Sequence, residues 1–171
     1  MEMAWLTHDQ ISQLLGKCKR HDHPKLEIVV RICLATGARW AEAASLRKSP
    51  LTKYKITYTN TKGRKNRNVP IGKELYESLP DDKKVRLFSD CYGAFRSALE
   101  RTSIELPTGQ LTHVLHHTFA SHFMMNGGNS LVLQRVLGHT DIKMTMKYAH
   151  FAPEHLEDAV KLNPLSQEMY S

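Results

Sequence analysis

The sequence lacks a long apolar run, an internal repeat and a cysteine framework. No stretch approaches the roughly 20 apolar residues that cross a bilayer, and no signal peptide is present. The cysteines, Cys18, Cys33 and Cys91, are odd in number and widely spaced. They form neither a paired framework nor a Cys-x-x-Cys metal pattern, so we expect reduced thiols in a cytoplasmic protein with no membrane partner.

The composition predicts one globular domain with an anionic partner. The chain has 171 residues, of which 41% are hydrophobic, enough to bury a sizeable core. Its net charge is +7 with histidine neutral, and its pI is about 9.4. A basic balance of this size favours a polyanion such as nucleic acid.

Helices are predicted in the N-terminal part. Thr7 and Gln10 have the spacing of a capping box. The dense apolar run 26–35 predicts a buried second helix that stops at Gly37, and a third helix is expected to begin near Arg39.

The pattern then changes to that of a small antiparallel hairpin. The β-branched and aromatic run 54–59 predicts one strand and 68–71 a second, with the basic, glycine-containing turn 60–67 between them. Helices are expected to resume at about 73–78 and 92–102. The fold class is therefore α+β and predominantly helical, with the small sheet in the N-terminal half.

The C-terminal half reads as successive short helices. We expect Thr112 and Asn129 to cap two of them, the second ending at Gly138. Thr140 is then predicted to cap a further short helix that presents Tyr148.

Four separated stretches carry polar residues in a recognisable order. They are Ala-Thr-Gly-Ala-Arg-Trp-Ala-Glu at 35–42, Thr-Lys-Gly at 61–63, Thr-His-Val-Leu-His-His-Thr-Phe-Ala-Ser at 112–121, and Leu-Gly-His at 137–139 followed by Tyr148. Their order and spacing resemble the catalytic domain of tyrosine recombinases, in particular that of temperate-phage integrases. The resemblance covers roughly residues 6–162.

The resemblance implies DNA strand cleavage and rejoining in phage integration and excision. Tyr148 would attack a phosphodiester, form a 3′-phosphotyrosyl link and release a 5′-hydroxyl, with neither ATP nor a metal cofactor. The implied partners are double-stranded DNA at attachment sites and three further copies in a homotetramer on that DNA. The implied location is the cytoplasm of a bacterial host cell, in association with the nucleoid.

The same resemblance assigns roles to individual residues. Arg39 would hold two phosphate oxygens through its planar fork, which suits a guanidinium better than an ammonium. His113 would assist as acid and base, His139 would hydrogen-bond the phosphate, and Lys62 would protonate the departing 5′-oxygen. The remaining basic residues of the turn are expected to contact the DNA backbone without reading sequence: Arg64, Lys65 and Arg67.

His116 departs from the family pattern. The pattern is His-x-x-Arg, but this chain has His113-Val-Leu-His116, so the second phosphate-binding arginine is absent. Loss of one such donor costs about 10²–10³ in rate by analogy with oxyanion donors. A natural weakened variant, an engineered inactive one and compensation by His117 are the alternatives, and His117 is expected to face elsewhere because one residue turns a helix by about 100°.

Two other function classes remain open. One is a recombinase-like module that binds DNA without cutting it. The other is a zinc-dependent hydrolase, since His113 and His117 have the i, i+4 spacing of two ligands on one helix face. No glutamate follows His113, so the His-Glu-x-x-His signature is absent, and we predict no metal site.

The domain organisation is expected to be a single catalytic domain over 1–171. Its core would cover about 6–162, ending in a helix that begins at Pro153, and 163–171 would form a loose tail. The family's N-terminal DNA-binding domains are absent from this chain, so we expect it to be a fragment of a longer protein.

Overall fold

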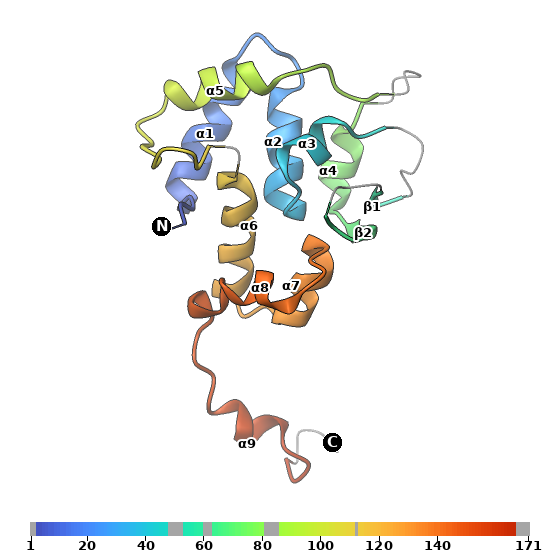
Figure 1. The fold of residues 1–171 in the computed structure, drawn as a ribbon, viewed down its shortest axis with the longest axis vertical. Helices are drawn as coiled ribbons and strands as arrows, with labels where there is room; N and C mark the ends of the chain where they lie inside the picture. Colours follow the sequence, from blue (N-terminus) through green and yellow to red (C-terminus); the bar gives the residue numbers. More distant parts are fainter. Residues whose placement is uncertain (1–2, 48–52, 60–62, 81–85, 112, 167–171) are drawn as a thin grey trace.

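The predicted fold class is confirmed. The computed structural model describes residues 3–47, 53–59, 63–80, 86–111 and 113–166, and within them a two-stranded antiparallel sheet lies at one side of a body of helices (Figure 1). In chain order the elements are α1 (His8–Arg20), α2 (Leu26–Thr36), α3 (Trp40–Ala44), β1 (Lys55–Tyr58), β2 (Arg67–Pro70), α4 (Lys73–Ser78), α5 (Tyr92–Glu100), α6 (Val114–Met125), α7 (Ser130–Leu137), α8 (Ile142–Met146), the 3₁₀ helix η1 (Ala149–Phe151) and α9 (Asp158–Leu162).

Local signals set the first helix boundaries as predicted. The Thr7 side chain accepts from the Gln10 backbone N–H, and the Gln10 side chain accepts from the Thr7 backbone N–H, so the capping box is complete. Helix α2 ends at Gly37, which has φ 71°. Two features require glycine there. The positive φ is strained for other residues, and a Cβ would lie 2.5 Å from Leu137 Cδ2 and 2.6 Å from Phe119 Cδ1.

The hairpin packs one face onto the helices. Its register pairs Lys55 with Pro70 and Tyr58 with Arg67, and the alternate residues Ile56 and Val69 are buried. The two predicted strands are thus confirmed. The alternation of buried and exposed positions fixes which face of the hairpin meets the core.

The core consists of two clusters. The larger one joins α1, α2, α3, α5 and the start of α6. The smaller one lies between α6, α7 and the segment after α8, and consists of Ala120, Met124, Leu133, Leu137 and Tyr148. Tyr148 is 0% exposed, so the residue singled out for chemistry is also a packing residue.

Two predictions for the C-terminal half are wrong. Asp141, not Thr140, caps α8, because the Asp141 carboxylate accepts the Lys143 N–H at 2.9 Å. Helix α9 begins at Asp158 rather than at Pro153. The segment before it is exposed, and a short helix without a packing surface does not offset the cost of its first turn.

Asn129 caps α7 as predicted, because its side chain accepts the Leu131 and Val132 N–H groups. Thr112 lies outside the described residues, and His113 occupies the N-cap position of α6 without a side-chain capping bond.

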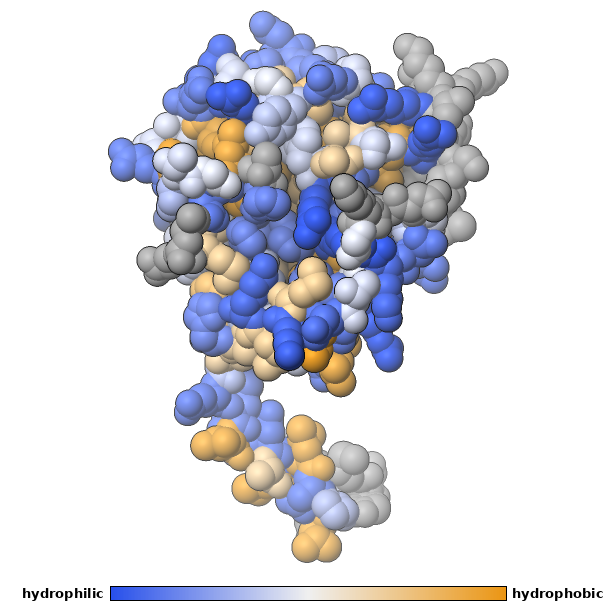
Figure 2. Space-filling view, viewed as in Figure 1, coloured by the Kyte–Doolittle hydropathy of each residue, from blue (hydrophilic) through white to orange (hydrophobic). Residues whose placement is uncertain are grey.

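The C-terminal segment extends away from the body (Figure 1). Its large apolar side chains lie in solvent, and they are visible as an apolar surface in Figure 2: Leu156, Val160, Leu162 and Leu165. None of the helices in the described ranges has the length and apolarity needed to cross a membrane.

Candidate active site

Glu42 is the centre of a buried charge cluster. From α3, its carboxylate accepts hydrogen bonds from the Arg39 backbone N–H at 3.0 Å and from Arg67 at 2.9 and 3.0 Å, and it also pairs with Arg64. Burial by itself raises the pKa of Glu42, but the hydrogen bonds and charges of Arg67 and the charge of Arg64 outweigh it and hold that pKa below its ordinary value. Two guanidinium groups, those of Arg64 and Arg67, therefore share one ionised carboxylate, which also accepts the Arg39 backbone N–H.

The hairpin is held against the end of α7. Arg67 Nε donates to the Val136 carbonyl at 2.7 Å, and the Lys65 N–H donates to the Gly138 carbonyl at 2.9 Å. Gly138 caps α7 with φ 70°, which confirms it as the predicted stop. These bonds place the basic turn beside His139, the next residue.

His116 is buried and neutral. Its Nδ1 lies 2.7 Å from the Gly37 carbonyl, an acceptor only, so Nδ1 carries the proton. Burial lowers the pKa of His116 well below its ordinary value, and the nearby Arg64 charge lowers it further. A neutral imidazole whose N–H already bonds a carbonyl does not supply the positive charge of an arginine.

His117 contacts the tyrosine. Its Nδ1 lies 2.6 Å from the Tyr148 hydroxyl, so the expectation that His117 faces elsewhere is wrong. The residues of α6 from Val114 to Thr118 are all buried, so adjacent side chains both meet protein, on different sides of the helix. The apolar residues of α6 occur on more than one side of the helix, as Leu115, Ala120 and Met124 show, and this was the sequence signal that could have indicated it.

The electrostatic setting keeps the histidines and the tyrosine of the site neutral. Burial lowers the pKa of His117 to about 4 and that of His139 to about 4, with positive neighbours adding to the effect. His139 Nδ1 lies 2.7 Å from Thr145 Oγ1. Burial raises the pKa of Tyr148, although Arg64 and Arg39 oppose the rise, so its phenol is protonated at neutral pH.

The other predicted site residues divide into three groups. His113 is exposed, with its ring centroid 5.9 Å from that of His117, and burial together with the Arg39 and Lys147 charges lowers its pKa. Lys65 is exposed, whereas Arg64 and Arg67 are buried against Glu42, which does not fit a role for them as freely accessible backbone contacts. Lys62 lies outside the described residues.

Sequence reasoning did not identify Glu42 and His117 as parts of this site.

Among the described residues, no three His, Cys, Asp or Glu side chains are grouped so that they could hold a metal ion.

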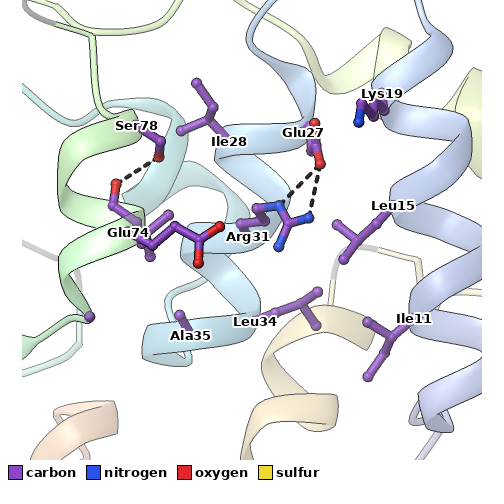
Figure 3. Close-up of a pocket in the computed structure, with 12 residues that line it drawn as sticks. Ile11, Leu15, Lys19, Glu27, Ile28, Arg31, Leu34, Ala35, Glu74 and Ser78 are labelled. Carbon is purple, nitrogen blue, oxygen red and sulfur yellow. Dashed lines mark hydrogen bonds and ion pairs between the residues drawn. The ribbon is translucent and has the colours of Figure 1, made fainter.

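A separate groove lies away from the tyrosine site. It has a volume of about 720 Å³ between α1, α2 and α4, and apolar side chains line it together with the Arg31–Glu27 ion pair (Figure 3). None of the residues around Tyr148 lines it, so this groove and the tyrosine site are separate features.

The domain is mostly helical, and its basic hairpin packs beside a segment that contains a buried tyrosine. The profile of the Phage integrase family matches residues 4–155, and the chain belongs to that family. The integrase of Escherichia phage 186 is 89% identical over 165 residues, covering 96% of this chain and 49% of the relative. The integrase of Haemophilus phage HP1 is 62% identical with the same coverage.

Solved structures agree with this placement. The catalytic domain of bacteriophage HP1 integrase superimposes with a TM-score of 0.93 at 61% identity, covering 97% of this chain and 98% of that one. XerA recombinase, at 23% identity and a TM-score of 0.72 over 96% of this chain and 67% of that one, shares the fold. The chain spans about half the length of the curated relatives it matches.

Proposed function

We propose that this chain is the catalytic part of a phage integrase that cuts and rejoins DNA strands in site-specific recombination. The observation that carries the proposal is a buried tyrosine that feels the charges of Arg64 and Arg39, beside a cluster in which Arg64 and Arg67 share the single Glu42 carboxylate. Such a cluster has surplus positive charge. It suits a reaction in which a phosphodiester gains negative charge in its transition state.

The proposed step is a transesterification. The Tyr148 oxygen attacks phosphorus, the Oη–P bond forms and the P–O5′ bond breaks, while the phenol loses its proton and the 5′-oxygen gains one. The 3′-phosphotyrosyl link conserves the phosphoester bond, so that a 5′-hydroxyl of another strand reverses the step without ATP. Arg39 and His139 are the proposed phosphate contacts, and Lys62 is the proposed proton donor to the 5′-oxygen.

We assign His117 as the base that accepts the phenol proton. His113 is its neighbour on the solvent-exposed side. His117 is neutral at pH 7, and its Nδ1 is already within hydrogen-bonding distance of the phenol at 2.6 Å. Because Tyr148 is buried, the arrangement is a resting one, and DNA binding must expose the hydroxyl. Substituting His117→Gln should slow cleavage by about 10²-fold at neutral pH, and the loss should shrink as pH rises because hydroxide then removes the proton.

His116 supports a second candidate, a module that binds DNA without cutting it. Its N–H bonds the Gly37 carbonyl and its ring is neutral, so it does not replace an arginine. The two candidates are separated on a nicked duplex, where an active enzyme is trapped as a covalent adduct visible on a denaturing gel.

Four proteins decide the function: the chain as written, His116→Arg, Tyr148→Phe and the double variant. We expect an adduct with the first two, a faster one with His116→Arg, and none when Tyr148 is phenylalanine. An adduct in either Tyr148→Phe lane would overturn the assignment of the nucleophile. Binding without any adduct, even with His116→Arg, would favour the non-cutting module.

The partners follow from the same proposal. We assign double-stranded DNA at attachment sites as the substrate, with Lys65 contacting its backbone, and a homotetramer on that DNA as the working assembly. The domain would act beside separate DNA-binding domains of a longer protein, at the nucleoid of the bacterial host.

A further inference from the structure

Arg64 carries two buried N–H groups without partners. Its side chain is 1% exposed, and its Nη1 pairs with Glu42. Within the described part of the chain, neither its Nε nor its Nη2 has a hydrogen-bond acceptor. An unsatisfied buried donor on a charged group is strongly unfavourable, so such an arrangement calls for a ligand or a function.

The neighbouring arginine is different. Arg67 pairs with the same carboxylate, but its Nε, Nη1 and Nη2 all have acceptors, namely Val136 O and the two Glu42 oxygens. Arg67 therefore fixes the hairpin, whereas Arg64 has donor capacity left over. The Arg39 Nε is likewise buried with no acceptor among the described residues.

The Arg64 charge acts on the reacting group. It opposes the burial that raises the pKa of Tyr148, and it helps to lower the pKa values of His116 and His139. These three side chains come from α6, the α7–α8 turn and the segment after α8. The Arg64 charge therefore acts on His116, the position at which the His-x-x-Arg pattern has its arginine.

Resting on the proposed function, we infer that Arg64 is a catalytic residue that binds a non-bridging oxygen of the scissile phosphate, in place of the guanidinium absent at position 116. The phosphate accepts from the unpartnered Nε and Nη2, while Nη1 stays on Glu42. Arg39 holds the phosphate from the other chain segment. Arg64 forms no covalent bond in this step and stays protonated throughout.

The test uses single-turnover cleavage of a nicked duplex at saturating DNA, with either a normal phosphate or a methylphosphonate at the scissile position. A methylphosphonate carries no charge on the non-bridging position, so an arginine that stabilises that charge matters less. We expect Arg64→Gln to slow cleavage of the phosphate by about 10²-fold and of the methylphosphonate by less than about tenfold.

Two controls isolate this effect. Arg67→Gln removes a guanidinium from the same carboxylate, so its loss should be equal on both substrates. Arg31→Gln lowers the net charge on an exposed helix face and should leave the rate unchanged on both. Thermal melting of each variant reports folding, and Arg64→Lys retains the charge near Glu42 if Arg64→Gln does not fold.

The His116→Arg background supplies an independent measurement. If Arg64 substitutes for the absent guanidinium, the loss caused by Arg64→Gln should be smaller there than in the chain as written. Equal losses of Arg64→Gln on the two substrates, or in the two backgrounds, would overturn the inference. So would a chain that forms no adduct as written but does with His116→Arg, an outcome that leaves the proposed function intact. Failure of both proteins would instead count against the proposed function.

Discussion

The Tyr148 hydroxyl is bordered by imidazoles that are held neutral. His117 bonds it, and His116 and His139 lie in the same buried cluster, with ring centroids 6.0 Å apart. With neutral rings, the positive groups that act on this cluster include Arg39, Arg64 and Lys147, whose Nζ lies 5.4 Å from the centroid of the Tyr148 ring. The protonation of these histidines should therefore be visible in the stability of the domain.

The first prediction concerns pH. His117 and His139 have folded pKa values of about 4 against an ordinary 6.5, so the unfolded state binds more protons between these values. The free energy of unfolding should therefore be level above pH 6.5 and fall as pH decreases towards 4. Urea unfolding at pH 7.5 and pH 5.5 measures this change, in a window above the ordinary Glu pKa of 4.5.

A double variant, His117→Gln with His139→Gln, serves as the control. It removes both titrating rings, so its stability should change less between the two pH values, whatever its absolute stability. An undiminished pH dependence in this variant would show that other groups cause it.

At this scale the sequence motifs identified some of the site. Arg39 and His139 could be placed because each follows a glycine that ends a helix, and Tyr148 because of its spacing after the Leu-Gly-His stretch. The contacts of Glu42 with Arg64 and Arg67 join residues 22 and 25 positions apart, and the His117–Tyr148 contact joins residues 31 apart. No local pattern encodes such contacts, because they depend on how separate elements pack.

At the scale of elements, the turn between α2 and α3 holds His116 of the site in place. Gly37 combines φ 71° with a close approach of Leu137 and Phe119, and its carbonyl accepts from His116. We predict that Gly37→Ala destabilises the domain by about 3 kcal/mol, the sum of left-handed strain and overpacking. Gly109→Ala is the matched control, since Gly109 has φ 82° but open space around its Cβ position, and should cost only about 1 kcal/mol. Equal losses in urea unfolding would show that packing at Gly37 contributes nothing.

The Glu42 carboxylate joins α3 to the hairpin through its ion pairs with Arg64 and Arg67. Glu42→Ala leaves Arg64 and Arg67 as buried, unpaired cations, and should cost about 3–5 kcal/mol. Glu27→Ala breaks an exposed pair with Arg31 and should cost less than about 1 kcal/mol. Urea unfolding of both variants gives the comparison. A Glu42→Ala loss no larger than that of Glu27→Ala would mean that the buried cluster relaxes into water.

Most elements could be predicted because their boundaries are chemical and local. Thr7, Asn129, Gly37 and Gly138 each act within one helical turn. The start of α8 was misplaced because Thr140 and Asp141 are adjacent cap formers, and only the backbone decides between them. The start of α9 was misplaced because an exposed amphipathic segment takes its helical length from a partner surface.

For the whole molecule, charge governs the predicted DNA affinity. With a net charge of +7, binding to duplex DNA should weaken with salt at a log–log slope of about −0.9 for each phosphate neutralised. Lys65→Ala should reduce that slope by about one unit on specific and unrelated sequences alike, because a phosphate contact carries no sequence information. A titration between about 50 and 500 mM salt, a tenfold range, measures both slopes. A loss confined to one sequence would show that Lys65 reads bases.

The C-terminal segment is the part of the molecule that its own body does not cover. Leu156 is 81% exposed and Leu165 is 87% exposed, and α9 lies apart from the helices (Figures 1 and 2). Exposed apolar side chains in this number are unfavourable in a lone domain, which favours packing against a second copy. Deleting the chain after Pro153 should therefore change the free energy of unfolding by no more than about 0.5 kcal/mol, since the deleted residues contribute little to the core.

The same truncation should abolish cooperative assembly on DNA. Sedimentation and gel mobility of the intact and truncated proteins, with and without a duplex carrying two binding sites, give the comparison. Leu156→Ser with Val160→Ser should reproduce the defect without shortening the chain, because it removes the apolar contact and keeps the backbone. Truncated protein that unfolds would place the segment on its own domain, and truncated protein that assembles normally would place the assembly interface elsewhere.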